Sequence, residues 1–251
     1  MKWHLGYVLA ITIMSGGSLS AQTVTSQPPR FHGFVVVNGG YQLASNDFAD
    51  GATRRQYAED GRIDTSYKVK AGPALDIAGG AHVWKQLGVS VGVSRFSTST
   101  PATLTGTVPH PFFFNRLRSV SGSVSGLKRE ELAVHVQGRG ILQLSQRFEV
   151  MVFGGPSFFQ VKQAVVADFT ISESYPYDDA TFQSATTSEP KASRIGFNAG
   201  GDVAFFFSRQ VGVGATAQYA GTTVEVAAAG GSKRELKVGG GKVGFGLRLR
   251  F

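Results

Sequence analysis

The sequence predicts an all-β protein, an eight-stranded antiparallel transmembrane up-and-down β-barrel, and three observations support this fold class. Apolar and polar residues alternate with a period of two along eight segments, as in strands with one apolar and one polar face. Very short and long connections between these segments also alternate. The polar face is rich in Gly, Ser, Ala and Thr, which suit the crowded interior of a narrow barrel.

The composition narrows the possible classes of protein. The chain has 251 residues, no cysteine, 33 glycines, 19 phenylalanines and a formal net charge of +8. Without cysteine, neither a disulfide nor thiol chemistry is available. The near-zero mean hydropathy argues against a helical membrane protein, which needs stretches of about 20 apolar residues. It is compatible with a membrane barrel, whose apolar residues are diluted by alternation.

The amino-terminal segment 1–21 reads as a secretory signal peptide. Lys2 and His4 form a short basic start, an apolar run of ten follows, and "SLSA" before Gln22 offers a cleavage site. The alternative is an amino-terminal membrane anchor, but ten apolar residues are too few to span a bilayer. We therefore expect cleavage, a short polar linker over 22–30 and a barrel over 31–251.

Eight segments have the character of strands, and their connections differ by side. The segments are 31–42, 64–83, 87–97, 130–145, 148–165, 193–207, 211–226 and 235–251. The connections 84–86, 145–147 and 208–210 read as tight hairpins, whereas 44–63, 98–129, 166–192 and 227–234 read as long loops. In an up-and-down barrel this order places all three hairpins and both chain ends on one side. Bacterial outer-membrane barrels have this asymmetry, with short periplasmic turns and longer external loops.

The alternative is a soluble eight-stranded ligand-carrying barrel or a sandwich, in which the bulky face is buried. In 87–94, Leu87, Val89, Val91 and Val93 alternate with glycine and serine. Small residues outside a soluble barrel would leave its backbone exposed, whereas small residues inside and bulky residues toward lipid suit a membrane barrel. We therefore predict that the bulky face points outward.

The closing segment carries a family resemblance. Val243, Phe245, Leu247, Leu249 and Phe251 alternate up to the carboxy-terminal aromatic residue. In this, and in the architecture of 31–251, the chain resembles the small outer-membrane β-barrels of Gram-negative bacteria, most of all the eight-stranded OmpA/OmpX-type barrels. The resemblance implies that these five residues form the insertion signal read by the barrel assembly machinery. It also implies an outer-membrane location with both termini in the periplasm.

The polar residues at the alternate strand positions that face inward are expected to fill the interior of the barrel. They include Asp76, His82, His135, Arg139, Glu149, Asp202, Lys242 and Arg248. An eight-stranded barrel is just wide enough for side chains to fill, so we expect opposite charges to pair in a polar plug. The alternative is a narrow or gated pore.

The loops supply the candidate partner contacts. Arg116, Arg118, Lys128 and Arg129 form a basic set in the second long loop and are predicted to contact lipopolysaccharide phosphates. Solvated loop charge is the alternative. Phe112 to Phe114 in the same loop are unusually apolar for an exposed segment and suggest an interfacial or partner-binding patch.

The expected function is non-catalytic. No histidine, serine and acid converge at the outer rim in a recognisable spacing, and we expect no cofactor, metal or nucleic-acid partner. The protein is expected to contact the lipid bilayer and to serve a structural or surface-interaction (adhesion) role through its loops. A narrow small-solute channel is the second reading, and a lipid A-modifying enzyme is the third.

Overall fold

A computed structural model describes residues 32–43, 47–227 and 233–251, and the regular elements in these ranges are all β-strands. The signal-peptide and linker predictions lie outside the described residues. The described residues contain no helix long and apolar enough to cross a membrane. The twelve strands are β1 (Gly33–Gln42), β2 (Phe48–Gln56), β3 (Glu59–Tyr67), β4 (Gly72–Trp84), β5 (Leu87–Pro109), β6 (Leu117–Gln143), β7 (Phe148–Gln163), β8 (Val165–Glu173), β9 (Ala180–Ser188), β10 (Lys191–Phe206), β11 (Val211–Ala227) and β12 (Lys233–Arg250).

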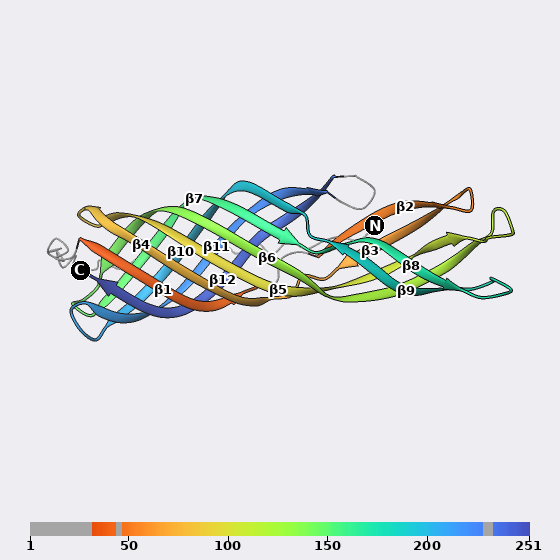
Figure 1. Cartoon of the computed structure of the whole chain (residues 1–251). Helices are drawn as coiled ribbons and strands as arrows, with labels where there is room; N and C mark the ends of the chain where they lie inside the picture. Colours follow the sequence, from red (N-terminus) through yellow and green to blue (C-terminus); the bar gives the residue numbers. More distant parts are fainter. Residues whose placement is uncertain (1–31, 44–46, 228–232) are drawn as a thin grey trace, which may run out of the picture.

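Eight of these strands form a closed antiparallel ring in the order β1, β4, β5, β6, β7, β10, β11 and β12. The ring closes where β12 pairs with β1, from Phe34 opposite Arg250 to Gln42 opposite Lys242. Figure 1 shows the ring at one end of an elongated molecule. The predicted eight-stranded antiparallel barrel is therefore confirmed.

Three regions predicted as long loops are largely β-structure, which corrects the sequence interpretation. Region 44–63 contains β2 and the start of β3, and region 166–192 contains β8 and β9. Region 98–129 is the far half of β5 and β6, which are 23 and 27 residues long. A membrane-spanning strand needs only about 9–11 residues, so both strands continue well beyond a bilayer.

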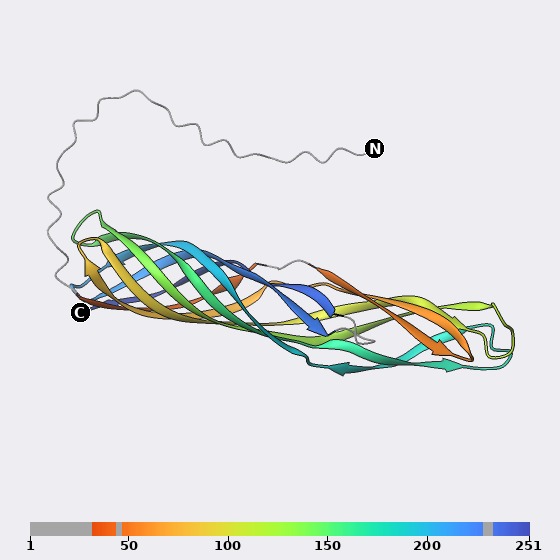
Figure 2. The same cartoon turned by 90° about the horizontal axis from the view of Figure 1, so that it is seen from above.

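The strands beyond the ring form an extension, which comprises β2, β3, the far halves of β5 and β6, β8 and β9. The β2–β3 hairpin pairs with β5 through β3, and β8 pairs with β9 in a separate two-stranded sheet. Figure 2 shows the extension running away from the ring, at the end opposite the short turns and the carboxy terminus.

The outer surface of the ring is an apolar belt. Large apolar side chains on alternate positions are exposed there: Leu75, Ile77, Val89, Val91, Val93, Leu132, Val134, Val136, Val152, Phe158, Ile195, Phe197, Val203, Phe205, Val243, Phe245, Leu247 and Leu249. Such a continuous apolar surface is unfavourable in water and favourable in hydrocarbon. The bulky face therefore points outward, toward where lipid would lie.

Strand β5 reverses its polarity along its length while keeping its parity. From Leu87 to Val93 the outward residues are apolar, and the inward residues are glycine and serine. From Arg95 onward the outward residues are Arg, Ser, Pro and Thr, whereas Phe96, Ala102 and Leu104 are buried on the inward face. The strand therefore passes from an environment that is apolar outside to one that is aqueous outside.

Strand β12 shows the same reversal. Its outward residues change from Phe245 and Val243 to Lys237 and Glu235, and its inward residues change from Arg248 to Val238. Strand β6 contains one residue more than β5 at this boundary, and this extra residue exchanges the inward and outward positions of β6. The register with β5 shifts between Thr100 and Ala102, opposite Gly126, whose φ of +77° is accessible to glycine without strain.

The belt can be tested by depth along one strand. Val91→Arg places a charge in the middle of the belt, and we expect it to destabilise the membrane-embedded barrel by about 2–4 kcal/mol. Thr105→Arg is the matched control, because Thr105 is also outward on β5 but lies in the extension. Urea unfolding of protein folded into vesicles measures both, and equal effects would contradict the assigned boundary.

Candidate functional site in the lumen and the extension

The centre of the lumen is an ion pair between Arg248 on β12 and Asp202 on β10. Arg248 Nε donates to Asp202 Oδ1 at 3.0 Å, and Arg248 Nη1 donates to Asn38 Oδ1 at 2.6 Å. The Thr216 hydroxyl donates to the same carboxylate. Both charged side chains are almost fully buried. Since a buried charge is tolerated only when it is paired and hydrogen-bonded, this cluster fixes four strands of the ring to one another.

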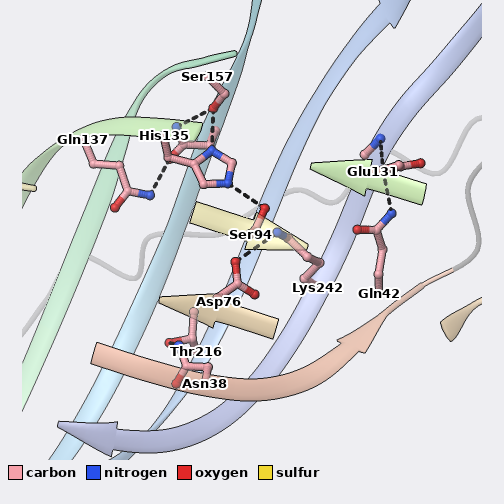
Figure 3. A network of polar contacts seen from close by, with 12 residues as sticks. Asn38, Gln42, Asp76, Ser94, Glu131, His135, Gln137, Ser157, Thr216 and Lys242 are labelled. Atoms are coloured by element: carbon pink, nitrogen blue, oxygen red, sulfur yellow. Dashed lines mark hydrogen bonds and ion pairs between the residues drawn. The ribbon is translucent and has the colours of Figure 1, made fainter. Parts of the chain in front are cut away.

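A second ion pair and a histidine lie nearer the extension. Lys242 Nζ lies 3.1 Å from Asp76 Oδ1. His135 is held between two serines, with Nε2 2.9 Å from Ser94 Oγ and Nδ1 2.8 Å from Ser157 Oγ (Figure 3). These contacts join β4, β5, β6, β7 and β12 across the lumen.

The remaining predicted interior residues lie toward the short turns. Arg139 donates to Ser90 Oγ at 2.7 Å and to Gln137 Oε1 at 3.0 Å, and its guanidinium stacks over two phenylalanine rings. Glu149 lies 3.5 Å from Arg250. His82 is only partly buried and lies edge-on to Phe34, with ring centroids 6.0 Å apart. His82 has the inward parity of β4 and lies at the end of the strand nearest the short turn.

The sequence interpretation missed the layer that separates the lumen from the extension. Arg129 Nε donates to Glu131 Oε1 at 2.7 Å, and Arg129 Nη2 donates to the Lys237 carbonyl at 2.7 Å. Glu131 Oε2 accepts from Gln42 Nε2 at 3.1 Å and from the Gly239 amide at 2.9 Å. The available signal was the Arg-x-Glu spacing, which places both side chains on one face of a strand.

One small pocket lies among the ion-paired side chains of the lumen. This pocket, of about 30 Å³, is bounded by Asn38, Asp76, His135 and Asp202, among others. This volume holds about two water molecules. The arrangement at this level is a plug of paired side chains.

The extension is folded around an apolar core of its own. Ile63 and Tyr67 of β3, Leu104 of β5, Val120 of β6 and Phe169 of β8 are among its buried members. Tyr67 stacks on Phe48, and its hydroxyl oxygen accepts a hydrogen bond from the Val166 amide at 3.0 Å. Burial raises the pKa of Tyr67 to about 12, so its phenol stays neutral under ordinary conditions. The extension is therefore a packed unit.

The basic set predicted for the second loop is not a cluster, and two of its members are buried. Arg129 belongs to the layer described above, and Arg118 is buried and ion-paired with Glu173. Arg116 and Lys128 are exposed, but they are twelve residues apart on or beside β6, about 40 Å along an extended strand. The four residues therefore do not lie together on one surface, because ion pairs hold Arg118 and Arg129 inside. Their contact with lipopolysaccharide stays a prediction.

Polar contacts tie together the three hairpin ends of the extension, which we call the tip. Glu59 accepts from the Asn115 amide at 2.7 Å, and the Tyr57 hydroxyl donates to Glu173 at 2.8 Å. The hydrogen bond to Glu173 is the main cause that raises the pKa of Tyr57. Arg116 Nη2 lies 2.8 Å from Asp178. The β2–β3, β5–β6 and β8–β9 ends are thus fixed to one another.

The tip presents exposed aromatic side chains. Phe112, Phe113 and Phe114 are 72%, 55% and 75% exposed, and Tyr175 is 86% exposed. His110 shapes this turn, because its fully buried ring accepts hydrogen bonds from the Phe112 and Phe113 amides at 3.1 and 3.2 Å. A rigid turn therefore holds three apolar rings in solvent.

The residues predicted to be the insertion signal, Val243, Phe245, Leu247, Leu249 and Phe251, all point outward and are exposed. Phe251 also closes the ring through backbone hydrogen bonds with Gly33 at 2.9 Å. Their recognition by an assembly machinery stays a prediction. Among the described residues, no three His, Asp or Glu side chains lie close enough together to hold a metal ion.

The central ion pair makes a specific prediction for stability. Asp202→Ala leaves Arg248 buried without its partner, and we expect a loss of about 3–5 kcal/mol in the free energy of unfolding. The double variant Asp202→Leu with Arg248→Met replaces both charges with apolar groups and should recover much of that loss. Urea unfolding in vesicles compares the two, and a double variant as unstable as the single one would contradict the assigned pairing.

Comparisons with known proteins agree with this architecture. No protein-family model matches the chain, and no curated protein does. Among solved structures, the outer membrane protein OprG from Pseudomonas aeruginosa matches with a TM-score of 0.51 and 11% identity, over 88% of this chain and 97% of that one. Neisserial surface protein A matches with a TM-score of 0.44 and 10% identity, over 87% and 97%. The attachment invasion locus protein Ail of Yersinia pestis matches with 0.36 and 12%, over 88% and 99%.

The likeness to OprG, at such low identity, bears on the fold alone. It agrees with the closed antiparallel ring of eight strands. The chain therefore has the fold of the small outer-membrane β-barrel proteins.

Proposed function

We propose that this protein is an integral outer-membrane barrel whose role is non-catalytic surface interaction, carried out by the aromatic tip of its extension. The observation that carries the proposal is the tip itself. Three hairpins are locked together by polar contacts while Phe112, Phe113, Phe114 and Tyr175 remain in solvent. Rigid exposed aromatic groups are the side chains that most often anchor protein interfaces.

The extension places this surface away from the membrane. Strand β5 continues for 14 residues beyond Arg95, about 45 Å of extended strand. With the apolar belt in the outer membrane, the short turns and the carboxy terminus would face the periplasm and the tip would face the exterior. The solved structure of OprG, an outer membrane protein, supports the membrane assignment through the shared fold.

The proposal includes the absence of catalysis. His135 between Ser94 and Ser157 is the closest approach to a nucleophile–base pair in the described lumen. It is only 2% exposed and lies inside the plug, where a substrate has no access. Its two serine contacts instead satisfy both ring nitrogens of a buried histidine.

Adherence tests the proposed role. Cells displaying the protein should adhere to an epithelial monolayer or to immobilised extracellular-matrix proteins. The triple variant Phe112→Ser, Phe113→Ser and Phe114→Ser should reduce that adherence at least about tenfold, because it removes the apolar anchors without touching the extension core. Thr103→Ser, Thr105→Ser and Thr107→Ser on the outward face of β5 form the control. Unchanged adherence of a surface-exposed, folded triple variant would overturn the proposal.

A small-solute channel is the competing function, and the filled lumen makes it testable. We expect the wild-type protein to show no steady conductance in a planar bilayer, because paired side chains occupy the interior. The variant Asp76→Ala with Lys242→Ala removes one pair and should open a measurable leak. Steady single-channel steps in the wild type would favour the channel.

A further inference from the structure

Basic residues gather on one sector of the ring, just beyond the apolar belt on the side of the extension; three of them are exposed and Lys162 is half-buried. Arg95 on β5, Lys128 on β6, Lys162 on β7 and Lys191 on β10 lie on four strands that are neighbours in the ring. On each strand they occupy the same outward-facing alternate positions as the residues of the apolar belt. We call this set the basic rim.

The register brings two of these lysines face to face. Lys162 on β7 is directly opposite Lys191 on β10. On its other side Lys162 is opposite Glu130 on β6, and Glu130 already lies 3.8 Å from Arg95. Like charges directly opposite in a sheet are destabilising, so the lysine pair is favourable when an anion lies between or above the two ammonium groups.

The surrounding charges leave the sector positive. Glu189 is exposed two residues before Lys191. Arg194 has the inward parity of β10, opposite the buried Phe159, and does not belong to this sector. With the four residues of the rim and Glu130, the sector holds four cations and two carboxylates, which leaves an excess of two positive charges. A ligand with more than one negative charge would match this excess better than a monoanion.

The level of the rim indicates what kind of anion it meets. Directly below it, on the same strands, Phe158, Leu132 and Ile195 are exposed as part of the apolar belt. Lysine side chains at the end of such a belt extend their ammonium groups into the headgroup region of a bilayer. An anion at this height that also has acyl chains would contact both the lysines and the belt.

We propose that the basic rim binds the phosphate groups of a multiply phosphorylated, acylated lipid of the outer leaflet, of the lipopolysaccharide type, while its acyl chains lie along β6, β7 and β10. This inference rests on the proposed outer-membrane orientation. It replaces the four-residue contact expected from the sequence and retains only Lys128 of that set.

Native mass spectrometry of the folded, detergent-extracted protein tests the site. The probes are purified bis-phosphorylated lipid A, the same lipid with its phosphates removed, and inorganic pyrophosphate. Lys162→Gln with Lys191→Gln should weaken binding of phosphorylated lipid A on the order of tenfold. The control Lys70→Gln with Lys237→Gln removes two exposed cations elsewhere at the same boundary and should change binding little.

A gain-of-binding variant excludes a merely structural effect. Glu130→Gln removes the carboxylate between Arg95 and Lys162 and should strengthen binding of phosphorylated lipid A. The assignment is overturned if the lysine variant binds as the wild type does, if the control loses as much, or if dephosphorylated lipid A binds equally. Pyrophosphate binding as tight as that of the lipid would assign the site to free phosphate and also overturn it.

The outcome separates this inference from the proposed function. Binding in detergent does not depend on adherence, and the lysine variant leaves the aromatic tip intact. Failure of the lipid site with retained tip-dependent adherence would therefore reject the rim alone. Heat-modifiable gel migration of each variant confirms that its barrel is folded.

Discussion

The structure depends on one constraint, the need to pair every backbone amide and carbonyl of the strands where no water can replace a partner. A sheet meets this need inside hydrocarbon only by closing on itself. The register between β12 and β1 achieves that closure, from Phe34 opposite Arg250 to Gln42 opposite Lys242. Once the ring is closed, each side chain faces either the outside or the lumen. The solvent on each side then determines which residues are tolerated, and the reversal of polarity at Arg95 and Glu130 marks where the outer solvent changes.

Strands β5 and β6 connect the ring to the extension. They run unbroken from the short turns to the tip, so the extension is held by the ring's own strands. At the junction, the buried pair of Arg129 and Glu131 joins β6 to β1 and β12 through Gln42 and the backbone of Lys237 and Gly239. On the extension side of this layer the core is apolar, whereas on the side of the short turns the interior holds buried ion pairs together with apolar side chains such as Phe34 and Phe153. The layer therefore lets one continuous sheet enclose two different kinds of interior.

The ring was predictable from sequence because most of its strands carry a strong alternation of bulky and small residues, although 31–42 is apolar on both parities around Phe34 to Val37 and its faces could not be assigned. The extension was not, because its outward positions are serine and threonine and its inward positions are often alanine, glycine or valine, as in 98–108. This weak contrast resembles a loop composition. The extra residue at Gly126 also exchanges the parities of β6 partway along. The burial of Arg118 was beyond local reasoning, since its acidic partner Glu173 lies 55 residues further along the chain. For Arg129 the local signal was the spacing to Glu131, but its contact with the Lys237 carbonyl lies 108 residues away. The burial of Tyr67 was equally hard to predict, because the Val166 amide that donates to its hydroxyl lies 99 residues further along the chain.

The filled lumen directs the search for function to the surface. Arg248, Lys242 and Arg250 each have an acidic partner among the described lumen residues, and breaking a buried pair of this kind is strongly destabilising. Two surfaces then carry features that the fold itself does not require. The aromatic residues of the tip lie far beyond the belt, so they are not a membrane girdle, and the hairpins that display them are already secured by ion pairs. The opposed lysines of the rim add repulsion to a sheet that would close without them. Because these features cost stability and contribute nothing to the core, the proposed contacts are assigned to them: lipid at the rim and an external partner at the tip.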